Sequence, residues 1–200
     1  TLESALAMPF PANEKSAKAD TQLQYASTLL ATNRLDQAAA LYRQLLAEDH
    51  GNAAAWQGLV RVEHAMGHDS EALQTVESMS PATYEAAMRD AGFETTVASI
   101  YQAENKLDVA QDLLAKALAQ QTTAGQKPSP AIEMQLAGIY MERGNAQLAY
   151  PSYQRVLTDD PSRADAWAGS LSVLHATNRD KEALAQVQLI PAPVRAQLET

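Results

Sequence analysis

The sequence predicts an all-α fold in which about five helical hairpins stack into an α-solenoid. Eight glycines among 200 residues, 46% hydrophobic content and abundant Ala, Leu, Gln and Glu favour helix over strand. A period of about 34 residues places small and aromatic residues at fixed offsets, as stacked hairpins require. A longer period, called here the long period, repeats Tyr42, Leu46, Asp49, Trp56, Val62, His64, Glu71, Ala72, Leu73 and Val76 as Tyr153, Leu157, Asp160, Trp167, Val173, His175, Glu182, Ala183, Leu184 and Val187.

Five units follow from aligning the small residue at each helix crossing. After residues 1–18, which are a lead-in or the end of a preceding repeat, we expect an array over 19–200 with units at 19–52, 53–90, 91–129, 130–163 and 164–200. In each second helix a small residue precedes a larger one by four positions, namely Ala38 and Tyr42, Ala72 and Val76, Ala110 and Leu114, Ala149 and Tyr153, and Ala183 and Val187. Positions four apart share one helix face, so the small residue admits the neighbouring helix while the larger one fills the space beside it.

The turns between paired helices carry residues that tolerate the left-handed backbone conformation at a helix end. These residues are Asn33, Gly67, Asn105, Gly144 and Asn178. Ser80-Pro81 predicts a short extra helix over residues 81–90, and Ser129-Pro130 predicts the start of the next first helix in the same way. The second helices of units two and five are expected to be short because Pro81 and Pro191 follow them closely.

Unit four has small and aromatic residues at regular spacing. It reads Leu136-Ala137-x-x-Tyr140-x-x-x-Gly144-x-x-x-x-Ala149-x-x-x-Tyr153 and ends with Leu157 and Pro161. This pattern resembles the tetratricopeptide repeat family. Trp56 and Trp167 stand where the family often has Trp, although packing between helices is their favoured role. The resemblance covers roughly residues 19–197 and implies a right-handed superhelix. We expect kinks at the insertions after repeats two and three, because the units at 53–90 and 91–129 are longer than the first.

Two shorter motifs are the helix ending Glu71-Ala72-Leu73-x-x-Val76-x-x-Met79-x-Pro81 and the later Ile100-Tyr101-Gln102. They resemble the periplasmic repeat region of the C component of bacterial cellulose synthase. This resemblance implies a periplasmic scaffold in exopolysaccharide (cellulose) synthesis and export, with export-complex components or the glucan as partners. We also expect the natural protein to continue with further repeats, because the residues after Ile190 supply no polar capping face.

In this family the first helices line a concave groove that binds the partner. By offset within each unit, the resemblance places there Gln57, Arg61, His64, Thr95, Ser99, Gln102, Met134, Met141, Ser172 and His175. This small and weakly polar lining suits a protein or peptide, because Gln and Ser can meet a peptide backbone and Met adapts to apolar side chains. A carbohydrate-binding module is an alternative that would require aromatic side chains exposed along the groove.

Other partners and functions are disfavoured by composition. The net charge of −9 and the scattered basic residues argue against nucleic acid. No apolar run approaches the roughly 20 residues of a membrane span, so we expect no membrane insertion of this segment. The cysteine-free sequence is compatible with the periplasm or the cytoplasm, and in the latter case the chain would be an adaptor or assembly module.

No motif predicts an enzyme, a cofactor or a metal site. Nucleophile-elbow, phosphate-loop and His-Glu-x-x-His patterns are missing from the sequence. His64 and His68 are four apart, but Gly67 separates them at a helix break and a third ligand is missing. The acidic residues are expected on solvated turns and outer faces rather than in a catalytic pair.

Overall fold

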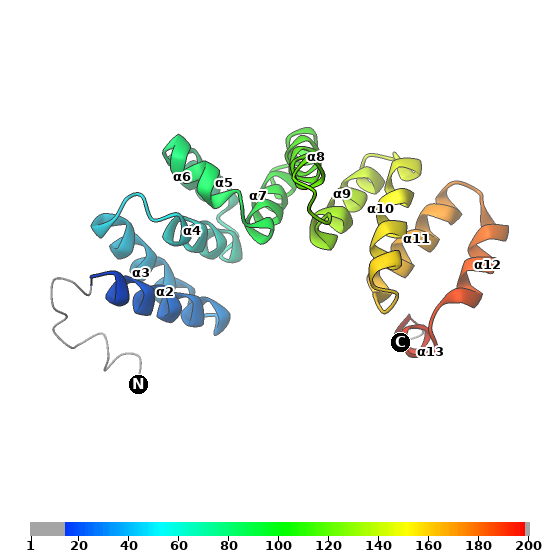
Figure 1. Ribbon diagram of the computed structural model, residues 1–200, viewed down its shortest axis with the longest axis horizontal. Helices are drawn as coiled ribbons and strands as arrows, with labels where there is room; N and C mark the ends of the chain where they lie inside the picture. Colours follow the sequence, from blue (N-terminus) through cyan, green and yellow to red (C-terminus); the bar gives the residue numbers. More distant parts are fainter. Residues whose placement is uncertain (1–14, 199–200) are drawn as a thin grey trace. The chain divides into compact units, whose positions relative to one another are not determined.

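The computed structural model describes residues 15–198, and every regular element in that range is a helix (Figure 1). In chain order the helices are α2 (Lys15–Ala31), α3 (Leu35–Glu48), α4 (Ala53–Ala65), α5 (Asp69–Glu77), α6 (Pro81–Ala87), α7 (Ala91–Ala103), α8 (Leu107–Thr123), α9 (Pro130–Glu142), α10 (Ala146–Asp159), α11 (Ala164–Ala176), α12 (Asp180–Leu189) and α13 (Ala192–Leu198). They form two compact units, called unit 1 and unit 2 from here on, each of which contains several of the repeats. Unit 1 ends at Glu104 and unit 2 begins at Asn105. Within 15–198 no helix is both long and apolar enough to cross a membrane.

In unit 1 helices α2 to α5 pack each against the next, and α4 is central because α2, α3, α5, α6 and α7 all contact it. The small residues predicted at the crossings, Ala38 and Ala72, are fully buried. Tyr42 is buried beside them, and its hydroxyl group lies 3.2 Å from the Ser27 hydroxyl. The core of this unit therefore follows the predicted pattern of small and large residues four apart.

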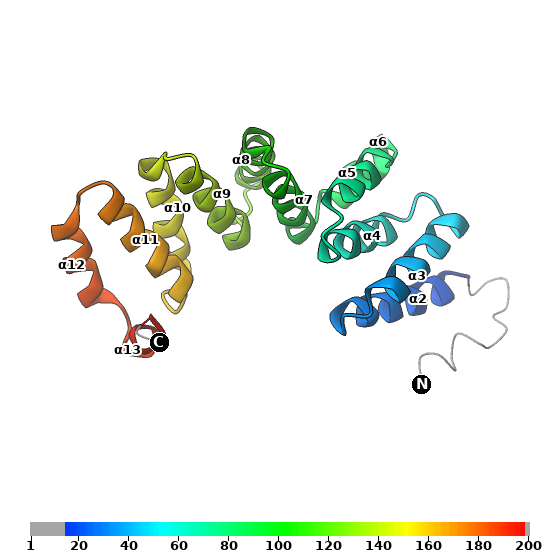
Figure 2. The same ribbon diagram turned by 180° about the vertical axis from the view of Figure 1, so that it is seen from behind.

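In unit 2 the chain runs back and forth through α8, α9, α10 and α11, and α12 and α13 both pack on α11 (Figure 2). One buried cluster joins α9, α10, α11, the end of the α12 segment and α13 through Ala137, Ala149, Tyr153, Val156, Leu157, Ala166, Trp167, Val173, Ile190 and Val194. Trp167 lies within this cluster, which confirms the packing role predicted for the tryptophans.

The predicted turns are confirmed. Within the described range, the positive φ angles of non-glycine residues belong to Asn33, Asn105 and Asn178 at 57–58°, and Gly67 and Gly144 have φ angles of 76° and 73°. An asparagine side chain tolerates this conformation better than most others, and glycine has no side chain to clash. Four of these positions close hairpins within a unit, and Asn105 lies in the turn between α7 and α8.

The predicted insertions and short helices are also confirmed, with one difference in length. The extra helix α6 begins at Pro81 as expected but ends at Ala87, and the Ser80 side chain accepts a hydrogen bond from the Thr83 amide. Helix α9 begins at Pro130. The second helices α5 and α12 have 9 and 10 residues, against 14 in α3 and α10. Of the predicted lead-in, residues 1–14 lie outside the described range and residues 15–18 belong to α2.

The long period of the sequence is reproduced by the helices. A shift by this period, which takes Tyr42 to Tyr153, also takes the bounds of α3, α4 and α6 onto those of α10, α11 and α13. The contacts repeat as well, because the Trp56 indole donates to the His50 carbonyl and the Trp167 indole donates to the Pro161 carbonyl, both at 2.8 Å. Each unit therefore contains the same three-dimensional arrangement around its tryptophan.

Candidate functional site

Two of the predicted groove residues on α4 hold neighbouring parts of unit 1 in place. The Gln57 side-chain amide donates to the carbonyl oxygen of Ala87 at 2.7 Å. The Arg61 guanidinium lies 2.7 Å from the Asp90 carboxylate and 6.0 Å from the centre of the Phe93 ring. These contacts tie α4 to the end of α6 and to the start of α7, so both side chains have a structural role in addition to the predicted one.

The remaining groove residues of unit 1 also make local contacts. His64 pairs with Asp69 through Nδ1. On α7, which packs against α4, the Thr95 and Ser99 hydroxyl groups donate to carbonyl oxygens of their own helix, both at 3.0 Å. Gln102 is half-buried on the same helix. Unit 1 thus brings its six predicted groove residues onto two adjacent helices, where their role in binding stays a prediction.

In unit 2 the predicted residues lie on α9 and α11, which are in contact. Met134 and Met141 are half-buried and pack against the core cluster. Ser172 and His175 are exposed, and Nδ1 of His175 lies 3.1 Å from the Asp180 carboxylate. This pair repeats the one made by His64, and both histidines therefore bridge to the start of the following helix.

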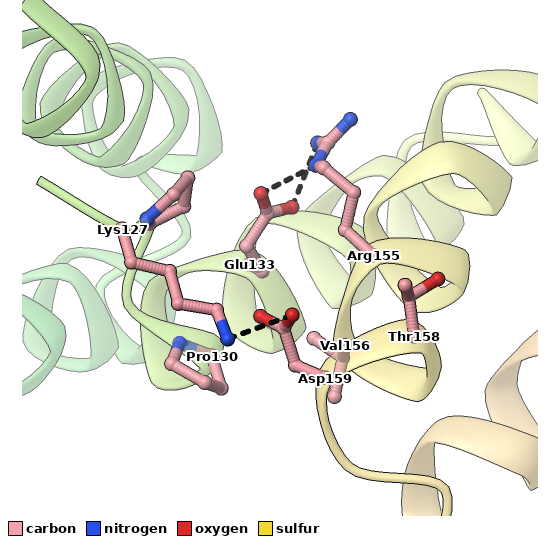
Figure 3. A pocket seen from close by; sticks show the side chains of 8 residues that line it. Lys127, Pro130, Glu133, Arg155, Val156, Thr158 and Asp159 are labelled. Carbon is pink, nitrogen blue, oxygen red and sulfur yellow. Dashed lines mark hydrogen bonds and ion pairs between the residues drawn. The ribbon is translucent and has the colours of Figure 1, made fainter. Parts of the chain in front are cut away.

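A pocket that the sequence did not predict lies in unit 2, between the beginning of α9 and the end of α10 (Figure 3). Its volume is about 220 Å³, and its lining consists of Lys127, Pro128, Pro130, Glu133, Arg155, Val156, Thr158 and Asp159. The loop between Ala124 and Ser129, which is the second insertion, supplies one wall. Proline rings and the Val156 side chain make much of the surface apolar.

An ion pair with a buried acid and a half-exposed base forms one side of this pocket. The Glu133 carboxylate accepts hydrogen bonds from Nε and Nη2 of Arg155 at 2.6 and 2.7 Å. Nη2 also donates to the Ser152 hydroxyl at 3.1 Å. Only 2% of the Glu133 side chain is exposed, against 50% for Arg155. The hydrogen bonds to Glu133 raise the pKa of Arg155, although burial acts in the opposite direction.

A second ion pair faces the first across the pocket, as Figure 3 shows. Nζ of Lys127 lies 2.8 Å from the Asp159 carboxylate, and 69% of the Lys127 side chain is exposed. In both pairs the acid is less exposed than the base. The pocket therefore has neutralised carboxylates within and cationic groups at its rim.

The expectation that acidic residues lie on solvated surfaces is wrong for three glutamates. Glu63, Glu94 and Glu133 are buried. Glu94 and Glu133 occupy the fourth position of α7 and α9, where α4 and α11 carry Trp56 and Trp167. A glutamate at a position where other repeats have a packing residue is a sequence signal for a buried acid. A basic residue on the following helix is then the candidate for its ion-pair partner.

Glu94 carries a carboxyl group with a strongly shifted pKa. Burial, together with the negative charge of nearby Asp90, raises this pKa from 4.5 to about 7. No described residue forms an ion pair with Glu94, whereas Glu133 in the neighbouring repeat is paired with Arg155. Glu94 therefore retains its proton over a range in which an exposed carboxyl has lost it.

We expect the stability of the protein to fall as the pH rises from about 4.5 to about 7, because only the unfolded chain releases the Glu94 proton in this range. The Glu94→Gln variant should lose less of its melting temperature over the same interval, since its amide does not titrate. Circular dichroism melts of both proteins test this. Glu85→Gln, which changes an exposed acid on α6, is the control. Equal pH dependence for Glu94→Gln and the wild type would contradict the assignment.

The sequence comparisons agree with the repeat architecture. Residues 29–91 match the tetratricopeptide repeat family. The chain is 27% identical to cellulose synthase operon protein C of Escherichia coli strain K12, over 94% of this chain and 19% of that protein. It is 28% identical to the protein of the same name from Pseudomonas fluorescens strain SBW25, over 82% of this chain and 13% of that protein. The chain thus spans less than a fifth of the length of these relatives.

Solved structures show the same fold. One is YrrB, described as a tetratricopeptide repeat protein with an unusual peptide-binding site, which is 17% identical with a TM-score of 0.66 over 100% of this chain and 97% of YrrB. Another is PilF of Pseudomonas aeruginosa, 14% identical with a TM-score of 0.72 over 90% of this chain and 76% of PilF. Residues 29–91 therefore match tetratricopeptide repeats, and the helical hairpins of the described residues form an all-α fold of the α-solenoid class.

Proposed function

We propose that this chain is one stretch of a longer tetratricopeptide array that acts as a protein-interaction scaffold in bacterial cellulose synthesis and export, in the periplasm. The repeat fold supports the scaffold part, because stacked hairpins present extended surfaces and generally carry no catalytic centre. The single observation that carries the specific part is the similarity to cellulose synthase operon protein C along 94% of the chain. The partners on this proposal are proteins of the export complex, with the emerging glucan as a further candidate.

Cell fractionation and an in-frame deletion test the proposal together. An antibody against this chain should detect, in the source bacterium, a protein far larger than 200 residues in the cell-envelope fraction. Deleting the codons for residues 15–198 should lower the amount of secreted cellulose while the synthase remains present. A cytoplasmic protein near the size of this chain, or unchanged secretion after the deletion, would contradict the proposal and leave a general adaptor.

A further inference from the structure

We infer that the pocket between α9 and α10 is a docking site for a peptide segment of a protein partner, in which a bulky apolar side chain stands beside a carboxylate. This inference deepens the scaffold part of the proposed function and rests on it. It concerns a site at the end of a hairpin, and none of the predicted groove residues lines it. Three observations support the site: the size of the cavity, the charges around it and a related hollow in unit 1.

The size and walls of the cavity favour a single side chain as its occupant. A volume of about 220 Å³ is smaller than the roughly 300–1,000 Å³ of pockets that hold whole small molecules. Pro128, Pro130 and Val156 supply apolar surface. One large apolar side chain placed in such a pocket is the usual anchor of a protein interface. An aromatic or large aliphatic residue of the partner matches this space.

The charges around the cavity favour a carboxylate beside that anchor. Glu133 and Asp159 are already neutralised by Arg155 and Lys127, so a cationic ligand would have to displace a base from its acid. The two bases are the exposed members of the pairs. Nη1 of Arg155 makes no hydrogen bond in the described part of the chain, and Nζ of Lys127 has further protons to donate. A carboxylate at the rim can accept from both groups.

Unit 1 has a Lys–carboxylate pair at the equivalent end of a hairpin, but it has no arginine at the position of Arg155. Lys18 lies 3.8 Å from the Glu48 carboxylate, and Glu48 is the equivalent of Asp159 under the long period. These residues line a hollow at the corresponding end of the α2–α3 hairpin. Gln22 and Gln44 stand there in place of Glu133 and Arg155. The unit 1 hollow therefore lacks the ion pair that shapes the unit 2 pocket, which makes Lys18 a matched control.

Three small probes titrated into the ¹⁵N-labelled chain test the inference by amide NMR. N-acetyl-L-phenylalanine carries both the apolar group and the carboxylate, N-acetyl-L-phenylalaninamide carries only the apolar group, and acetate carries only the charge. We expect millimolar N-acetyl-L-phenylalanine to shift amides around Lys127, Val156 and Asp159, with weaker binding of the other two probes. Lys127→Glu should weaken this binding about fivefold or more, because it replaces attraction at an exposed rim by repulsion. Lys18→Glu should leave it unchanged.

The Glu133→Gln/Arg155→Gln double variant removes the buried pair without leaving a lone charge, and it should lose the preference for the acid over the amide. Its dispersed NMR spectrum would show that it is folded. Equal binding of acid and amide, an equal effect of Lys127→Glu and Lys18→Glu, or no shifts near the pocket would overturn the inference. These results leave the fractionation and secretion experiments untouched, so failure of the pocket and failure of the proposed function are distinguishable.

Discussion

Arg155→Ala is expected to lower the free energy of unfolding by about 2–4 kcal/mol, because it leaves the buried Glu133 carboxylate without its cation. Water that enters the half-exposed space left by the guanidinium solvates the carboxylate and moves the expected loss toward the smaller value. Urea denaturation followed by circular dichroism measures the change.

Two further variants separate the effect of the lone charge from lost packing. Glu133→Gln/Arg155→Ala should be more stable than Arg155→Ala alone, since a neutral amide replaces the charge. Arg43→Ala removes a similar partner from the buried Glu63, which still accepts a hydrogen bond from Thr75 at 2.6 Å. A smaller loss is expected there. If Arg155→Ala costs no more than Arg43→Ala, the ion pair is not an important contributor to the stability of unit 2.

Gly58→Ala should lower the free energy of unfolding by about 3 kcal/mol, because the added methyl group overpacks the core. An ideal Cβ at Gly58 would lie 2.2 Å from two ring atoms of Tyr42, and one at Gly169 would lie 2.4 Å from the equivalent atoms of Tyr153. Both rings are buried and have little room to move. Gly169→Ala should therefore be destabilising to a similar degree, as the long period requires.

Gly138→Ala is the matched control for these substitutions. Gly138 also lies inside a helix, α9, but apart from its chain neighbours and the backbone of its own helix no described atom lies within 4 Å of the position of its Cβ. Alanine there should stabilise the protein by about 0.5–1 kcal/mol, since it restricts the unfolded chain and favours helix. The melting temperatures of Gly58→Ala, Gly169→Ala and Gly138→Ala measure these changes. A melting temperature of Gly58→Ala at or above that of Gly138→Ala would contradict the close packing described for Tyr42.

The elements predicted well from the sequence are those whose causes are local. Asn33, Asn105 and Asn178 mark turns because a short polar side chain tolerates positive φ, whatever packs nearby. Ser80-Pro81 starts α6 through a side-chain cap and a ring that fits the first helical turn. The spacing also predicts four of the five alanines at the helix crossings, namely Ala38, Ala72, Ala110 and Ala149, which are buried. It is wrong for the fifth repeat, where Ala183 is half-buried and Val187 is exposed.

The pocket and the contacts of the inner-face residues were not predictable in this way. Lys127 and Asp159 are far apart in the sequence and meet only because the second insertion folds over the end of α10. Gln57 and Arg61 have partners near the end of α6 because that extra helix packs on α4. Such contacts depend on tertiary placement, which the repeat pattern does not encode.

The agreement of helix bounds after a shift by the long period has a consequence for how this array can evolve. A crossover between the coding sequences of α3 and α10, or of α4 and α11, joins a helix to its counterpart at the same residue of the same turn. The recombinant gains or loses one whole block of helices, and its junction lies within a helix that has the same length and the same flanking turns in both units. The length of the array can therefore change in complete steps that keep the register of the helices.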